Sequence, residues 1–167
     1  IYPMKKNSKY FSDTIFHDWK DALRGVYPAE VDTSEFSPIG RSVNDKLLPS
    51  AIQIFLMMSK INHRNLTFME VCHRYNKYVW YWFGILKKTK PDVIIFSDVP
   101  HIPYNLVIYN LAKMLGIRTL ILKRTNALPD KVICFDDFQE YREIREEYDK
   151  VKKKSPVIDR EILQYYE

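Results

Sequence analysis

Glycine is scarce in this sequence, with 4 residues among 167. The nucleotide motifs G-x-G-x-x-G and the P-loop are absent, as are the serine elbow G-x-S-x-G and the zinc motif H-E-x-x-H. Each pattern carries a specific chemistry, because it places backbone amides around a phosphate, a serine on a sharp turn, or two histidines on one helix face. Their absence argues against ordinary dinucleotide enzymes, P-loop kinases, elbow-type serine hydrolases and zinc proteases.

Cysteine and long apolar runs are also in short supply. The 2 cysteines, Cys72 and Cys134, have neither metal-type spacing nor a disulfide framework, so we expect small buried side chains. The longest apolar stretches, 51–58 and 79–86, are too short or too interrupted to cross a bilayer. The sequence starts without Met and without a signal-peptide pattern, so we expect a cytoplasmic piece of a larger protein.

The composition favours one globular domain, because 46% of the residues are hydrophobic and 28% are charged. The formal net charge of +5 favours a phosphate-bearing partner only weakly, since the basic residues lie in mixed runs. No helix-turn-helix, zinc-finger or RNA-binding signature is present, so we expect no nucleic-acid partner.

The first part of the chain predicts short helices between loops. Apolar residues at helical spacing predict a helix within Asp13–Arg24, which Gly25 would end. A loop is predicted over Ser34–Asn44, and Pro49 then introduces Ala51–Lys60. This last segment is apolar on almost all sides, which fits a buried helix or a strand, and we favour the helix.

A long helix is predicted from Thr67 to about Lys88. Thr67 and Glu70 have the spacing of a capping box, and apolar residues recur after them at steps of three and four. We interpret the aromatic residues of this helix as packing residues rather than a cofactor site.

The next segment predicts a strand, a helix and a second strand. Val93–Phe96 is a continuous apolar run, typical of a strand buried on both faces of a parallel sheet. Tyr104–Leu115 suits a crossover helix that Gly116 closes, and Ile117–Leu122 suits the second strand. Such a unit is a parallel, right-handed crossover.

After this unit, Val132–Phe135 predicts a third short strand and Gln139–Lys154 a charged helix. The expected fold is therefore a single Rossmann-like α/β domain, three-layered and with a mostly parallel sheet. Its expected parts are an irregular and helical region, a long helix with the strand–helix–strand core, and a tail, at residues 1–66, 67–154 and 155–167.

Polar residues follow each predicted strand. Ligands of open parallel sheets bind beyond the carboxyl ends of the strands, where loops and helix N-termini meet. We therefore expect a substrate site at this edge. The first strand end offers Ser97, Asp98, His101, Tyr104 and Asn105, the second Lys123, Arg124, Thr125 and Asn126, and the third Asp136 and Asp137.

His101 is the main candidate for proton transfer, because it lies between two prolines and because histidine is the residue type most often used as a general acid or base. Asp98 would orient it or act as a base. A structural histidine and a helix-capping aspartate are the competing interpretations. We expect His101 and Asp98 to be the catalytic pair.

Other polar residues are candidates for substrate binding. Lys123 and Arg124 could hold a diphosphate. His17 could lean over the same crevice, although packing is the commoner role for such a residue. A metal site from Asp98, His101 and an aspartate after the third strand is disfavoured because these residues are scattered along the sequence. We predict neither a metal nor a cofactor.

The segments 90–101 and 109–119 resemble the N-terminal Rossmann domain of two-domain, B-type glycosyltransferases of capsular or surface polysaccharide biosynthesis. The resemblance implies sugar transfer from a nucleotide-sugar donor to a glycan acceptor. It also implies that this domain holds the acceptor and supplies the base, with His101 and Asp98 at the matching positions. A second, C-terminal domain of the parent chain would hold most of the nucleotide, so this chain alone is expected to be inactive.

Two other functions stay open at this point. One is a non-catalytic Rossmann-like interaction module that docks another domain or protomer through the aromatic helix 68–86. The other is an enzyme resembling sugar-nucleotide epimerases, which would act without an acceptor. Peripheral association with a membrane surface and homo-oligomerisation are further interactions that the sequence leaves open.

Overall fold

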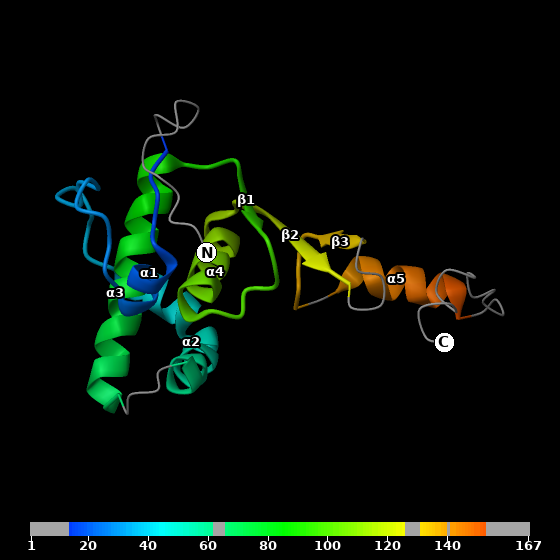
Figure 1. Cartoon of the computed structure of the whole chain (residues 1–167), viewed down its shortest axis with the longest axis horizontal. Coiled ribbons are helices and arrows are strands. Elements are labelled where there is room, and N and C mark those ends of the chain that lie inside the picture. Colours follow the sequence, from blue (N-terminus) through cyan, green and yellow to red (C-terminus); the bar gives the residue numbers. More distant parts are fainter. Residues whose placement is uncertain (1–13, 62–65, 126–130, 140, 153–167) are drawn as a thin grey trace.

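A computed structural model describes residues 14–61, 66–125, 131–139 and 141–152 (Figure 1). Within these ranges the protein is an α/β domain with a three-stranded mixed sheet. The elements in chain order are α1 (Trp19–Arg24), α2 (Arg41–Ile61), α3 (Phe68–Thr89), β1 (Val93–Phe96), α4 (Pro103–Leu115), β2 (Arg118–Arg124), β3 (Val132–Phe135) and α5 (Arg142–Val151).

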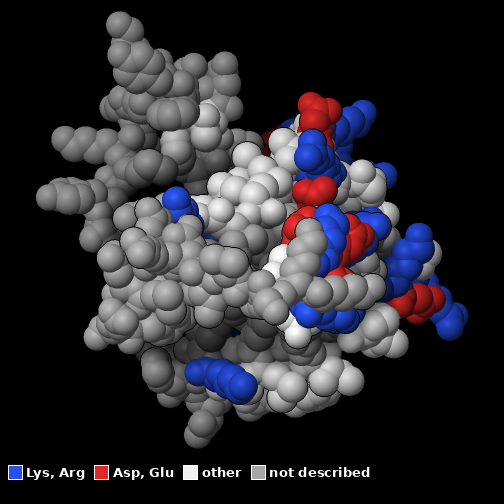
Figure 2. Space-filling view, turned by 90° about the vertical axis from the view of Figure 1, so that its right-hand side faces the viewer, with Lys and Arg blue, Asp and Glu red and all other residues white. Residues whose placement is uncertain are grey.

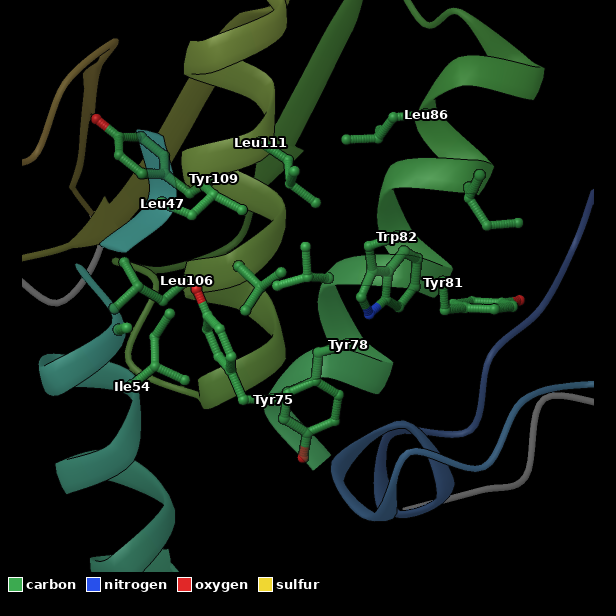
Figure 3. Close-up of a cluster of buried hydrophobic side chains, with 14 of the residues drawn as sticks. Leu47, Ile54, Tyr75, Tyr78, Tyr81, Trp82, Leu86, Leu106, Tyr109 and Leu111 are labelled. Carbon is green, nitrogen blue, oxygen red and sulfur yellow. The ribbon is translucent and has the colours of Figure 1, made fainter. Parts of the chain in front are cut away.

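The main core lies between α2, α3 and α4 rather than inside the sheet. Figure 3 shows side chains of these three helices pointing toward one another. Tyr78, Tyr109 and aliphatic residues such as Leu106 are fully buried there, whereas Tyr81 is fully buried on the other side of α3, stacked on Tyr27. The prediction that the aromatic residues of the long helix are packing residues is confirmed for this part of the helix.

The ends of α3 follow the predicted signals. The Thr67 hydroxyl accepts from the backbone N–H of Glu70, and the Glu70 carboxylate accepts from the backbone N–H of Thr67 at 2.8 Å. This reciprocal capping satisfies two amides of the first turn. At the other end, Lys90 adopts a left-handed conformation with φ of 44° and its N–H bonds to the Leu86 carbonyl.

The first predicted helix is shorter than expected. Asp18 caps α1 by accepting from the backbone N–H groups of Lys20 and Asp21, so the helix begins at Trp19. Ile15 precedes this cap and lies outside the helix, while Asp13 lies outside the described residues. The predicted stop is confirmed, because Gly25 has φ of 71°, a conformation that favours glycine.

Helix α2 is longer than expected, and this corrects two predictions. The helix begins at Arg41, inside the predicted loop, and continues through Pro49. An interior proline removes one backbone hydrogen bond and strains the preceding turn. Burial of Leu47 and Ala51 on the core side holds the helix across that position.

The parallel crossover is confirmed. Strands β1 and β2 pair in parallel, with Val93 opposite Arg118 and Phe96 opposite Ile121, and α4 connects them. Helix α4 ends as predicted, because Gly116 has φ of 71° and its N–H bonds to the Ala112 carbonyl.

The third strand runs in the opposite direction from the one expected. Strand β3 pairs antiparallel with β2, with Ile121 opposite Phe135 and Arg124 opposite Val132. The connection from β2 to β3 is short and contains no crossover helix in its described part, which is the geometry of an antiparallel pair. The sheet is therefore mixed.

The sheet has one covered and one open face. Phe96, Ile121 and Phe135 belong to the hydrophobic core that α4 shares, whereas Val93 and Ile95 are 42% and 59% exposed. The expectation of a strand buried on both faces is wrong for the described residues. Leu122 and Val132 are exposed as well, and so is Cys134, which corrects its predicted burial.

Helix α5 lies beyond the sheet, away from α2 and α3 (Figure 1). It begins at Arg142 and ends at Val151, so the described helix is shorter than the predicted one. Figure 2, seen from this side, shows acidic and basic side chains intermixed. Lys150 pairs with Glu147 at 2.6 Å, as expected for a charged surface helix. Among the described helices, none combines the length and apolarity that crossing a bilayer requires.

Candidate functional site at the strand ends

The carboxyl ends of β1 and β2 meet at one rim, as predicted. Ser97 and Asp98 follow β1 directly, and Lys123 belongs to the end of β2, which extends two residues past the predicted boundary. The Lys123 ammonium lies 3.3 Å from the Asp98 carboxylate. Residues 25 positions apart in the sequence are thus joined by an ion pair at the top of the parallel strands.

Asp98 is held as an anion. Its carboxylate accepts a hydrogen bond from the backbone N–H of Val99 at 2.7 Å. This bond, followed by the contacts with Lys123 and the charge of His101, lowers the pKa of Asp98 below its ordinary value despite partial desolvation. A carboxylate stabilised in this way is a poor proton acceptor, so Asp98 suits an orienting or electrostatic role better than that of a base.

His101 is held in one orientation by the backbone. Its Nδ1 lies 2.7 Å from the Val99 carbonyl oxygen. A carbonyl only accepts hydrogen bonds, so Nδ1 must carry the hydrogen and Nε2 of the neutral ring keeps a free lone pair. No partner of Nε2 is found among the described residues, and the imidazole is exposed. The geometry is therefore suited to accepting a proton at Nε2.

The N-terminus of α4 lies next to this loop. Ile102 occupies the N-cap position without a side-chain hydrogen bond, and Pro103 opens the helix. The first backbone N–H groups of a helix lack partners within it, and the helix dipole makes this end favourable for anions. Asn105 in the first turn is half-buried, and it remains a predicted contact.

Tyr104 belongs to the aromatic packing beneath the rim. Its ring stacks on Trp82 at a centroid distance of 6.2 Å and meets Tyr78 edge-on at 6.5 Å. Burial, followed by the charge of Asp18, raises the pKa of the Tyr104 phenol. The ring thus packs α4 against α3, and its contact with a substrate stays a prediction.

His17 is placed against α3. Its Nε2 lies 2.6 Å from the Tyr81 hydroxyl, and its ring lies 4.9 Å from that of Trp82. Desolvation by burial lowers the pKa of His17, although a hydrogen bond with the Ile15 backbone opposes this effect. The structure therefore gives His17 a packing role, and its predicted contact with substrate is not tested by this geometry.

The predicted diphosphate contacts, Lys123 and Arg124, are consecutive residues at the end of β2. Consecutive residues of a strand point to opposite faces of the sheet. Ile121 lies on the face of the sheet that the helices cover, so Lys123 lies on that face too. Arg124 lies on the open face. Thr125 comes next, and its N–H bonds to the Lys131 carbonyl at 3.2 Å. Asn126 lies outside the described residues.

The carboxyl end of the third strand does not lie at the rim with those of β1 and β2, but at the opposite end of the strands. Because β3 is antiparallel, Asp136 and Asp137 lie beside the start of β2. Thr119 donates its hydroxyl to the Asp136 carbonyl at 2.7 Å, and Lys113 pairs with Asp137 at 3.2 Å. Asp136 therefore lies at the other end of the sheet from Asp98 and His101, the residues with which the disfavoured metal site would have formed. No cluster of potential metal ligands occurs within the described ranges.

A hollow that the sequence did not suggest lies away from the rim. It has a volume of about 630 Å³ and lies between α2, α4 and the segment after β3. Asn110 lines it, and its side-chain nitrogen is buried without a hydrogen-bond partner among the described residues. Asp137, from the third predicted strand end, borders it, whereas none of the candidates from the first two strand ends does. The lining residues include Lys46, Ser50, Gln53, Asn110, Lys113 and Asp137.

Comparisons of this chain with protein-family models, with curated proteins and with solved structures found no match.

Proposed function

We propose that this chain is the acceptor-side domain of a cytoplasmic glycosyltransferase that extends a capsular or surface polysaccharide. The observation that carries the proposal is the rim at the ends of β1 and β2. There a histidine with a free Nε2 lies beside a carboxylate and an ammonium group that are 3.3 Å apart. The resemblance of segments 90–101 and 109–119 to B-type glycosyltransferases points to the same residues.

In the proposed reaction, Nε2 of His101 removes the proton from an acceptor hydroxyl. The hydroxyl oxygen then bonds to the anomeric carbon of the donor sugar. The bond from that carbon to the phosphate oxygen breaks, and its electron pair leaves with the nucleoside diphosphate. Asp98 offsets the positive charge that develops on His101, and Lys123 fixes the Asp98 carboxylate.

The donor would be held mainly by a second domain of the parent protein. We propose that the three strands described here belong to a Rossmann-like, mostly parallel sheet of three layers. The open face at Val93 and Ile95 would then be covered by further parts of that protein. This arrangement explains why a hydrophobic strand pattern coexists with an exposed strand face.

The proposal is tested by sugar transfer in the protein that contains this chain, with nucleotide sugars as donors and oligosaccharides as acceptors. Loss of a general base typically slows catalysis by about 10²–10⁴-fold. We expect a decrease of this size for His101→Ala, with little change in donor binding. His73→Ala is the matched control, because His73 is an exposed histidine on α3. Equal rates for the two variants would remove His101 from the mechanism.

A non-catalytic interaction module is the second candidate, and the open apolar face of the sheet favours it. The aromatic helix α3 is a less suitable docking element than the sequence suggested, since Tyr78, Tyr81 and Trp82 are buried within the chain. A pure interaction module would bind neither nucleotide sugars nor glycans in thermal-shift measurements and would show no transfer.

A further inference from the structure

The hollow between α2, α4 and the segment after β3 receives polar side chains from all three elements. Ser50 and Gln53 come from α2, Asn110 and Lys113 from α4, and Asp137 from the segment after β3. Its volume of about 630 Å³ falls within the range of small-molecule sites, which is about 300–1,000 Å³. The hollow therefore has both the size and the polar groups of a binding site.

Lys113 and Asp137 form a fixed ion pair in this hollow. The ammonium lies 3.2 Å from the Asp137 carboxylate and donates to the Asp136 carbonyl at 3.1 Å. In the described structure this leaves its third hydrogen for a ligand. The carboxylate also accepts from the backbone N–H of Gln139 at 2.8 Å, and its two oxygens have further lone pairs. A donor and an acceptor thus lie side by side, which suits two neighbouring hydroxyl groups, since a hydroxyl both donates and accepts.

Amide side chains supply further polar groups. Gln53 and Gln139 are exposed, and each carries a donor and an acceptor. The side-chain nitrogen of Asn110 is buried and has no hydrogen-bond partner within the described ranges. An unpaired buried donor is unfavourable, so rotation of this amide toward a ligand oxygen in the hollow would regain a hydrogen bond.

The same lining argues against other classes of ligand. Its cations are Lys46 and Lys113. Asp137 and the neighbouring carboxylate of Asp136 offset them, so a phosphate group meets no excess of positive charge from these residues. Tyr109 lines the hollow but is only 1% exposed, so its ring offers no face on which a flat base could stack.

We propose that the hollow binds a neutral sugar unit through neighbouring hydroxyl groups. Lys113 and Asp137 hold two of these hydroxyls, and the amides hold others. A sugar ring also carries C–H groups on its faces, and Pro49 and Met114 supply apolar contacts for them.

The hollow and the rim are separate sites. The hollow lies near the start of β2, about 20 Å from the rim at the other end of that strand, because each strand residue advances about 3.3 Å. One sugar unit therefore cannot occupy both. That the sugar in the hollow belongs to the acceptor glycan rests on the proposed function, whereas its binding does not.

Titration of the full chain with neutral trisaccharides of glucose, galactose, mannose and N-acetylglucosamine tests the site. We expect at least one of them to cause saturable shifts of the side-chain amide signals of Gln53, Asn110 and Gln139 in NMR spectra. Lys113→Met should weaken this binding by about 10-fold or more, because a hydrogen bond from a charged group is lost. The absence of such shifts with all four sugars would overturn the proposal.

A substitution on another element controls for a local change of structure around the ion pair. Gln53→Ala, on α2, should also weaken binding, by about 3-fold or more. Asn76→Ala is the matched control, because Asn76 is an exposed amide on α3 and does not line the hollow. Equal affinities of these two variants would contradict the site. Displacement of the sugar by inorganic phosphate would also contradict it, in favour of an anion site.

The same measurement separates this proposal from the proposed function. The Asp98→Asn, Lys123→Met double variant should keep the shifts at the hollow, because its changes lie at the rim. Loss of those shifts in the double variant would overturn a separate sugar site. Absence of sugar transfer in the parent protein, with the shifts at the hollow intact, would contradict the proposed function alone.

Discussion

The core between α2, α3 and α4 and the open face of the sheet differ in how completely their apolar side chains are covered. Between α2, α3 and α4, large side chains such as Tyr78, Tyr109 and Leu106 have exposures of 0% or 1%. On the open face of the sheet, Val93 and Ile95 are 42% and 59% exposed. The side chains compared are apolar in both regions.

A hydrophobic sequence pattern therefore predicts a helix or strand more reliably than it predicts the burial of its side chains. Burial depends on a second element that covers the side chains. Helix α4 supplies that cover for Phe96 and Ile121 on one face of the sheet, and no described element supplies it for the other face. Substitutions in the core between the helices should therefore change mainly the stability of the fold. Substitutions on the open face of the sheet should change mainly its contacts with other molecules.

The largest effect on stability is expected in the core between the helices. Leu106 is fully buried, so Leu106→Ala should lower the free energy of unfolding by about 2–5 kcal/mol, through lost burial and the cavity left behind. Ile95→Ala, on the open face, should cost far less. Urea unfolding of both variants measures the difference, and equal losses would contradict the contrast between the two regions.

A smaller effect is expected where a loop packs on α3. A methyl group added at Gly84 of α3 would overlap the ring of Phe36. Gly84→Ala should therefore cost about 1–3 kcal/mol from overpacking. Gly40→Ala is the control, because the space around Gly40 is open. If the overlap is the cause, Phe36→Ala and Gly84→Ala together should cost less than the sum of the two single changes.

The pH dependence of stability should report on His17. Burial lowers the pKa of His17 in the folded state, whereas the unfolded chain keeps the ordinary value near 6.5. The unfolded state therefore binds more protons as the pH falls below 6.5, and stability should decrease between about pH 7 and pH 5. His17→Gln should flatten this part of the profile, and His73→Gln should leave it unchanged. A profile that is the same in both variants would exclude this role.

The smallest effect is expected for the ion pair at the rim. Asp98 and Lys123 are both about half exposed, so Asp98→Asn should change the stability at neutral pH by at most about 1 kcal/mol. The lowered pKa of Asp98 means that this contribution is present above the ordinary carboxyl range and is lost as the pH falls through the folded-state value. Wild type and Asp98→Asn should therefore converge in unfolding experiments once the pH is below the folded-state pKa of Asp98. A loss several times larger would mean that the pair is structural.

Local signals in the sequence predicted the elements well where one residue type decides the geometry. Gly25 and Gly116 end helices in the left-handed conformation, and Thr67 and Glu70 cap α3, as expected. The parallel crossover followed from the spacing of two strands around a helix. It correctly placed Asp98 and Lys123 together.

Tertiary context decided the rest. The direction of β3 depends on a short connection rather than on its own four residues, so Asp136 lies at the opposite end of the strands. Pro49 does not end α2, because contacts with the core outweigh the missing hydrogen bond. The sequence also could not show that the Val99 N–H binds the Asp98 carboxylate while the Val99 carbonyl binds His101, because both contacts depend on the conformation of the loop.

The most direct test of the proposed site is a titration of the full chain with acceptor oligosaccharides, followed by amide chemical shifts in NMR spectra. We expect shifts at the loop 97–105 and at Lys123, and their loss in the Asp98→Asn, Lys123→Met double variant. Shifts confined to the hollow around Asn110 and Lys113, or no shifts with any acceptor, would contradict the proposed site at the rim.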